Sequence, residues 1–193
     1  LENPSPVDIT TAEQSCNGIG GNGTVPRYGK NYSVSGGGLV GNWNFSEGTG
    51  TTVADSSGNG NNGTLKNSAT WADGKVGKAV QLDGTDDYVD LGNSATLQPQ
   101  KVSLSLWFKT DTAGRVLRKR LYGYGLDVTS SKQVSFWMND AAATKFSATS
   151  PNTYADNAWH NATGVYDGTT VKLFIDGALV ATNNAGAIYY GAG

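Results

Sequence analysis

The stretch Val102-Ser-Leu-Ser-Leu-Trp-Phe108 decides the fold that we predict for this chain. Its first, third, fifth and seventh residues are large and apolar, and two serines and Trp107 stand between them. Because successive side chains of a β-strand point to opposite faces, this alternation predicts a strand with one buried face. The same period recurs in three other stretches, which are Leu39–Phe45, Val134–Met138 and Val171–Ile175.

No stretch repeats its apolar residues with a convincing helical period. Asp-Gly pairs at Asp167-Gly168 and Asp176-Gly177 separate the predicted strands, as hairpin turns require. We therefore predict an all-β fold, a two-sheet antiparallel sandwich with jelly-roll character.

The composition limits the class of protein. The chain has 193 residues, enough for one domain with a substantial core. Only 16% of the residues are charged and the net charge is −2, so we expect no nucleic-acid partner. No apolar run approaches the roughly 20 residues of a membrane helix, so we expect no membrane insertion. The wealth of Thr, Ser, Asn, Gly and aromatic residues favours a secreted protein, extracellular or at the cell surface.

The polar loop Asp55-Ser-Ser-Gly-Asn-Gly-Asn-Asn-Gly63 is the candidate metal site. Asp55, Ser57 and Asn59 carry oxygens at alternate positions, the spacing of the first half of a calcium loop. The second half differs, because the twelfth position is Lys66, where a bidentate Glu would be needed.

A cation in this loop would need a ligand from elsewhere, and the turn Gly84-Thr-Asp-Asp87 is the best donor. We predict a structural Ca²⁺ held by Asp55 and Asn59 together with Asp86 or Asp87. The alternative is a surface turn without metal, since Asn, Asp and Gly dominate turns for conformational reasons.

Three aromatic residues lie opposite the aliphatic faces of their strands: Trp107, Trp137 and Phe174. If those strands are neighbours in one sheet, the three rings share its outer face. Such a face is either covered by loops or by residues 1–36, or it binds a ligand, because flat aromatic rings stack on pyranose rings. We take these three residues as the candidate carbohydrate-binding residues.

One basic cluster lies at a predicted hairpin and consists of Arg115, Arg118, Lys119 and Arg120. It is either a solvated edge that discourages pairing with other sheets, or a contact for an acidic polysaccharide or a partner protein.

Catalysis is not expected. Glycoside hydrolysis needs two carboxylates flanking the bond, and the chain has only three glutamates, Glu2, Glu13 and Glu47, in no such arrangement. His160 is the single histidine and has no nucleophile placed with it in the sequence, so we interpret it as a structural hydrogen-bonding residue.

Several motifs follow one another in a set order: Gly38–Gly50, the Asp55 loop, Trp71–Val89, Trp159-His160, Val165-Tyr-Asp-Gly168 and Leu173-Phe-Ile-Asp-Gly177. In this order they resemble the laminin-G-like family of the concanavalin A-like lectin-glucanase superfamily, over about residues 37–180. The resemblance implies a jelly roll, an extracellular location and a structural calcium at the Asp55 loop. It also implies a non-catalytic carbohydrate-binding or adhesion module, whose partner is a carbohydrate or another cell-surface ligand.

The end of the chain departs from that family. A closing strand is expected there, whereas this chain runs into Tyr189-Tyr-Gly-Ala-Gly193. We therefore expect residues 37–193 to form a sandwich with one open strand position. The position can be filled by residues 1–36, by a strand of another copy, or by residues of a longer parent chain.

A second hypothesis follows from the open position: a structural subunit of a surface filament or appendage, completed by strand exchange between copies. The single cysteine, Cys16, excludes a disulfide within the chain. It is either buried and inert or available to pair with another chain.

Overall fold

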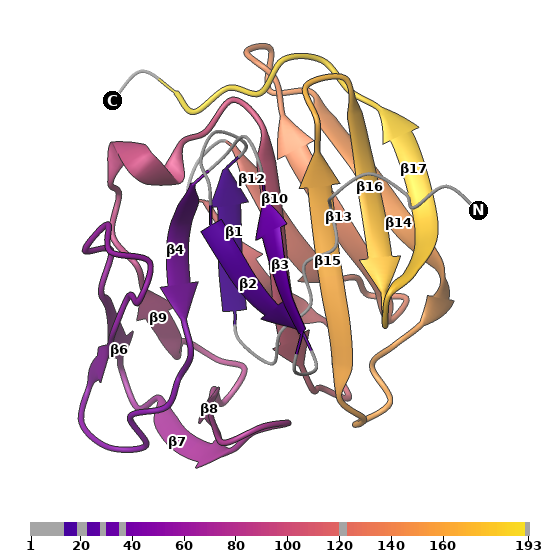
Figure 1. The fold of residues 1–193 in the computed structure, drawn as a ribbon. Coiled ribbons are helices and arrows are strands. Elements are labelled where there is room, and N and C mark those ends of the chain that lie inside the picture. Colours follow the sequence, from indigo (N-terminus) through magenta and orange to yellow (C-terminus); the bar gives the residue numbers. More distant parts are fainter. Residues whose placement is uncertain (1–13, 19–22, 28–29, 35–37, 120–122, 192–193) are drawn as a thin grey trace.

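The computed structural model describes residues 14–18, 23–27, 30–34, 38–119 and 123–191, and of the first three stretches the backbone only. Two antiparallel sheets are stacked face to face, which confirms the predicted all-β sandwich (Figure 1). In the described part of the chain, no helix is long and apolar enough to cross a membrane.

The larger sheet has six strands in the order β17-β16-β15-β10-β1-β4. Each strand is antiparallel to its neighbours. The strands are β1 (Gln14–Gly18), β4 (Leu39–Trp43), β10 (Val102–Phe108), β15 (His160–Tyr166), β16 (Thr170–Ile175) and β17 (Ala178–Asn184).

The smaller sheet has four strands that follow one another in sequence, so that β11 and β14 form its two edges. These strands are β11 (Gly114–Arg118), β12 (Tyr124–Val128), β13 (Gln133–Asn139) and β14 (Lys145–Thr153).

The core lies between the two sheets and is built from the predicted alternation. Leu104 and Leu106 of β10 and Phe136 of β13 are almost completely buried. The two sheets pack closely at Gly164 of β15, where an added Cβ would lie 2.3 Å from the Phe136 ring. The first predicted strand is shorter than expected, because Phe45 has a positive φ of 51° and β4 ends at Trp43.

Strand β1 occupies the position between β4 and β10. Cys16 is the direct partner of Leu104 on one side and of Gly41 on the other. In this structure the strand between β4 and β10 therefore comes from the same chain. The side chain of Cys16 lies outside the described residues.

Smaller elements surround the sandwich. Strands β5, β6 and β9 form a three-stranded sheet, and β7 pairs with β8 and β2 with β3. Their bounds are β2 (Gly23–Arg27), β3 (Lys30–Val34), β5 (Thr52–Val53), β6 (Gly63–Lys66), β7 (Thr70–Asp73), β8 (Lys78–Gln81) and β9 (Tyr88–Asp90), and a single 3₁₀ turn, η1, spans Ala95–Leu97.

Candidate functional site

The carboxylate of Asp55 closes its loop onto β4. Its Oδ1 accepts hydrogen bonds from the backbone amides of Asn42 and Ser57, both at 2.9 Å. Its Oδ2 accepts from the amide of Asn61, also at 2.9 Å. Partial burial pushes the pKa of Asp55 upward, but the hydrogen bonds from Ser57, Asn42 and Asn61 outweigh it and hold the pKa below its ordinary value.

Asn59 also connects the loop to β4. Its Nδ2 donates to the carbonyl of Leu39 at 2.7 Å and to the Oγ of Ser57 at 3.1 Å. Asp55 and Asn59 thus both tie the glycine-rich loop to β4 through direct hydrogen bonds.

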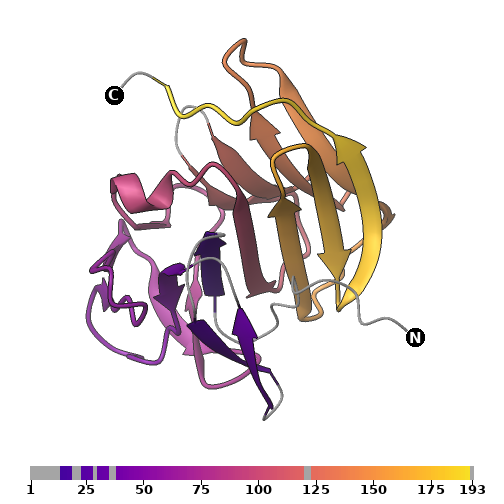
Figure 2. The ribbon, with the colours of Figure 1, turned by 45° about the horizontal axis from the view of Figure 1, so that its top comes forward.

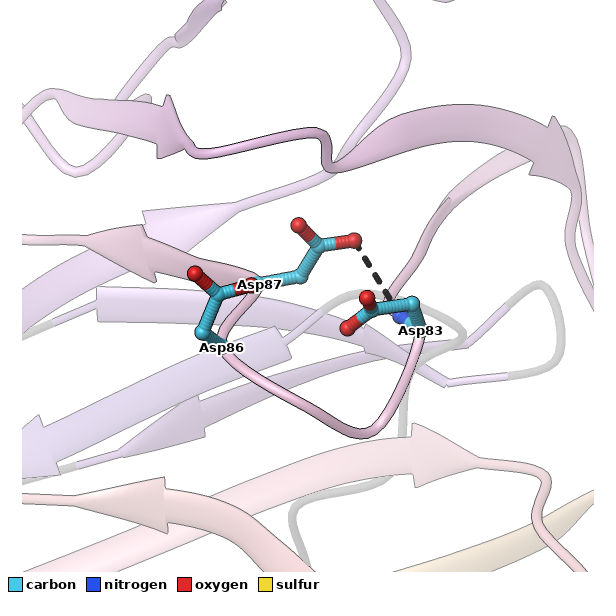
Figure 3. Close-up of side chains that lie close together, drawn as sticks. All are labelled: Asp83, Asp86 and Asp87. Atoms are coloured by element: carbon cyan, nitrogen blue, oxygen red, sulfur yellow. Dashed lines mark hydrogen bonds between the residues drawn. The ribbon is translucent and has the colours of Figure 1, made fainter.

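Asp86 and Asp87, predicted to complete the metal site, form a cluster with a third aspartate. Asp86 and Asp87 lie with Asp83, and one carboxylate oxygen of each lies within 4.8 Å of the others (Figure 3). Asp87 also accepts hydrogen bonds from the amides of Ser68 at 2.8 Å and of Asp83 at 3.1 Å. We call these three residues the aspartate turn.

Asp55 is not part of any such group among the described residues. The predicted site, with Asp55 and Asn59 joined by Asp86 or Asp87, needs only two carboxylates and stays a prediction. Asp83 was absent from the predicted set, although it stands in the same short turn of the sequence. The aspartate turn groups three carboxylates that could also hold a cation without Asp55.

The three candidate aromatic residues do not share one sheet. Trp107 and Phe174 belong to β10 and β16 of the six-stranded sheet, whereas Trp137 belongs to β13 of the four-stranded sheet. The condition for a common aromatic platform therefore holds for Trp107 and Phe174 only. Pairing between strands far apart in sequence decides which sheet each ring belongs to. The alternation within a single strand carries no information on that pairing.

The outer face of the six-stranded sheet between Trp107 and Phe174 is polar and buried. Ser105, Asn161 and Thr163 are each less than 5% exposed. The hydroxyls of Ser105 and Thr163 lie 2.8 Å apart, and the Nδ2 of Asn161 donates to the Oγ of Ser105 at 3.3 Å. Figures 1 and 2 place the β2–β3 hairpin on the outer side of this sheet. The polar residues between the two rings are therefore covered, whereas Trp107 and Phe174 themselves are half-buried.

Trp137 lies on the outer face of the four-stranded sheet, where Gly125 of β12 is its direct partner. A Cβ on Gly125 would lie 2.5 Å from Cζ2 of Trp137, so the indole extends over β12 in the space that a side chain would fill. The indole Nε1 donates a hydrogen bond to Oδ2 of Asp127 at 2.7 Å. The sequence of β12, with glycine two residues before an aspartate, therefore holds the Trp137 ring in place.

Two cations cover this ring. The Arg118 guanidinium lies 5.3 Å and the Lys145 Nζ 4.9 Å from the ring centroid, both within the distance of a cation–π contact. Lys145 also lies 3.8 Å from Oδ2 of Asp127. As a result only 3% of Trp137 is exposed.

The same face carries Arg115, the cross-strand partner of Asp127. We define the Trp137 face as Arg115, Arg118, Asp127, Trp137 and Lys145. Lys119, predicted to join the basic cluster, is instead buried and donates to the Oδ1 of Asn93, and its burial lowers the pKa of its ammonium. Arg120 lies outside the described residues.

Comparison with known proteins places this architecture in a family. A sequence model described as the concanavalin A-like lectin/glucanases superfamily matches residues 83–191, more than half of the chain. The chain belongs to this superfamily. The match includes all four strands that build the Trp137 face.

Two solved structures illustrate the concanavalin A-like fold of this domain. The binding domain of Paraclostridial Mosquitocidal Protein 1 is 14% identical, with a TM-score of 0.59, over 70% of this chain and 39% of that chain. Domain 4 of AbnA, a GH43 extracellular arabinanase from Geobacillus stearothermophilus solved in complex with arabinotriose, is 21% identical, with a TM-score of 0.56, over 72% of this chain and 73% of that chain. No curated protein matches the chain.

His160 of this concanavalin A-like domain links two loops. Its Nδ1 lies 2.8 Å from Oδ2 of Asp176 and its Nε2 lies 3.1 Å from Oδ1 of Asp156. Burial lowers the pKa of His160, but the hydrogen bonds and negative charges of Asp176 and Asp156 outweigh burial and raise it above its ordinary value. The ring packs edge-on against Tyr154, with centroids 5.1 Å apart. These contacts give His160 a structural position between the β14–β15 loop and the β16–β17 turn.

Proposed function

We propose that this domain is an extracellular, non-catalytic carbohydrate-binding module, and that the Trp137 face is its binding site. The observation that carries the proposal is the set of groups on this face: one aromatic ring, three cationic donors and one carboxylate acceptor. Sugar sites combine an aromatic ring for stacking with a few polar groups that fix orientation. The six-stranded sheet carries two half-buried aromatic rings as well, but the residues between them are uncharged and buried.

The non-catalytic part of the proposal rests on the carboxylates. Among the described residues on the outer face of β11–β14, Asp127 is the one acidic side chain. Glycoside hydrolysis uses a pair of carboxylic groups about 5–9.5 Å apart. Asp127 is also engaged with the indole of Trp137 and with Lys145, which suits a positioning role.

The extracellular part rests on composition and on one relative. Low charge and a wealth of Thr, Ser, Asn and Gly suit a secreted β protein. AbnA, whose domain 4 has a similar fold, is an extracellular arabinanase, and that domain was solved with arabinotriose. Binding of a glycan by a domain of this fold supports, by analogy, the same class of ligand here.

A glycan array tests the proposal. The wild-type domain is expected to bind at least one class of glycan, and Trp137→Ala is expected to abolish binding. Trp107→Ala and Phe174→Ala are the matched controls, because both remove an aromatic ring from the other sheet. Wild-type protein that binds no glycan would refute the proposal. Binding lost in the two controls but kept in Trp137→Ala would move the site to the six-stranded sheet.

A second candidate, a structural filament subunit, is favoured by one observation: β1 lies between β4 and β10, and removing it would leave two open strand edges. Residues 19–38, which connect β1 to β4, include the glycine-rich stretches 19–23 and 36–38. Such a connection is compatible with a strand that passes to another copy. Electron microscopy of concentrated protein distinguishes the two candidates, because a monodisperse monomer would contradict assembly.

A further inference from the structure

We propose that the Trp137 face selects acidic polysaccharides, chains that carry carboxylate or sulfate groups, over neutral ones. This inference rests on the proposed carbohydrate-binding function and adds the chemical class of the ligand. It follows from the charge of the face, from the way its cations converge, and from one unpaired acceptor.

The charge of the Trp137 face is opposite to that of the chain. The face combines three cationic side chains, Arg115, Arg118 and Lys145, with the single carboxylate of Asp127. The whole chain carries a net charge of −2. Positive charge is therefore concentrated on one face of an otherwise slightly acidic protein, where it favours an anionic ligand.

The cations converge on the ring from opposite edges of the sheet. Arg118 belongs to the edge strand β11 and Lys145 to the other edge strand β14. Cations that only guard an edge against pairing would point outward into solvent. Here both reach inward over Trp137, at 5.3 and 4.9 Å from its centroid.

Arg118 and Lys145 therefore cover the ring to which a ligand would bind. The two cations take the place on the indole that a sugar ring would occupy. An anionic group offers each of them a stronger partner than the ring, and arginine binds carboxylate or sulfate through a two-pronged contact. When Arg118 and Lys145 bind the acidic group of a polysaccharide, they leave the Trp137 ring. The exposed ring can then stack on the next sugar of the same chain. A neutral glycan lacks the groups that draw them away.

Asp127 adds an acceptor for a sugar hydroxyl. Its Oδ2 accepts from the indole of Trp137, whereas its Oδ1 is shielded from water and has no hydrogen-bond partner among the described residues. A shielded acceptor without a partner carries a free-energy cost. Movement of Lys145 toward a ligand would open this oxygen to a hydroxyl donor.

Binding to matched polymers tests the inference. We would titrate the full chain with polygalacturonate, with dextran sulfate, and with neutral galactan and dextran, and follow binding by calorimetry at low and high salt. We expect at least one acidic polymer to bind at least about tenfold more tightly than its neutral counterpart, with affinity that falls as salt rises. The acidic polymer that binds identifies carboxylate or sulfate as the recognised group.

Charge-neutral variants locate the effect. Arg118→Gln combined with Lys145→Gln is expected to lower affinity for the acidic polymer at least about tenfold. The control Lys109→Gln removes an exposed positive charge just after β10 and should leave affinity unchanged. Thermal melts confirm that each variant is folded.

The outcomes separate this inference from the proposed function. Equal binding of neutral and acidic glycans that depends on Trp137 but not on the two cations would overturn the inference and leave the function standing. Binding of no glycan at all would overturn both. Duplex DNA that binds as tightly as the acidic polysaccharide would show attraction to any polyanion and would also overturn the inference.

Discussion

Replacing Asp55 with alanine tests whether the glycine-rich loop is held by hydrogen bonds or by a cation. The substitution removes three acceptor contacts of 2.9 Å, to the backbone amides of Asn42, Ser57 and Asn61. Asn61 is buried, so its amide loses its partner without gaining water. The amide of Ser57 lies in a more open part of the loop and regains water at lower cost.

The expected magnitude follows from these contacts. A hydrogen bond to a charged acceptor contributes about 1.5–3 kcal/mol, and the partial rehydration of the loop reduces the sum, so we expect Asp55→Ala to lower the free energy of unfolding by about 2–4 kcal/mol. In a domain of this size 1 kcal/mol corresponds to about 2–4 °C, so the melting temperature should fall by about 5–15 °C. Asp111→Ala, at an exposed position, is the control and should change it little.

Melts with added calcium and with excess chelator complete the experiment. If hydrogen bonds hold the loop, Asp55→Ala is destabilised to the same extent in both conditions. A wild-type protein that melts like Asp55→Ala once chelator is present would refute this reasoning and assign the role of Asp55 to a cation. The same melts test the aspartate turn, where bound calcium would raise the wild-type melting temperature and Asp86→Asn would remove the increase.

Three further predictions concern stability and assembly. Because the pKa of His160 is raised, its charge-dependent contribution is full below pH about 6.5 and is lost as pH rises through the raised value, so the difference in urea unfolding between wild type and His160→Gln should be larger at pH about 5.5 than at pH about 8.5. Gly164→Ala should cost at least about 1–3 kcal/mol in thermal unfolding, because its Cβ meets the Phe136 ring at 2.3 Å, and an unchanged melting temperature would contradict the close sheet packing. Leu104→Cys should form a disulfide with its partner Cys16 within one chain, seen on a non-reducing gel as a monomer, whereas crosslinked dimers would show that β1 passes between copies.

Strand identity was predictable because it depends on neighbouring residues. The alternation in Val102–Phe108 specifies a strand with one apolar face in any sheet that buries that face, and the structure buries the same residues. The sequence also predicted that Trp107, Trp137 and Phe174 point away from the core faces of their strands. It could not show which sheet each strand joins, because pairing connects residues far apart in the chain.

The candidate site depends on such distant pairings. Arg118 and Lys145 are separated by 27 positions in the chain, and the register of β11 through β14 brings both to Trp137. Asp55 has the sequence spacing of a calcium ligand, yet the fold places the amides of Asn42 and Asn61 against its two oxygens. Local sequence thus determined which residues carry oxygens, charges and rings. The tertiary structure decided their partners, because a contact forms only where separate strands are brought side by side.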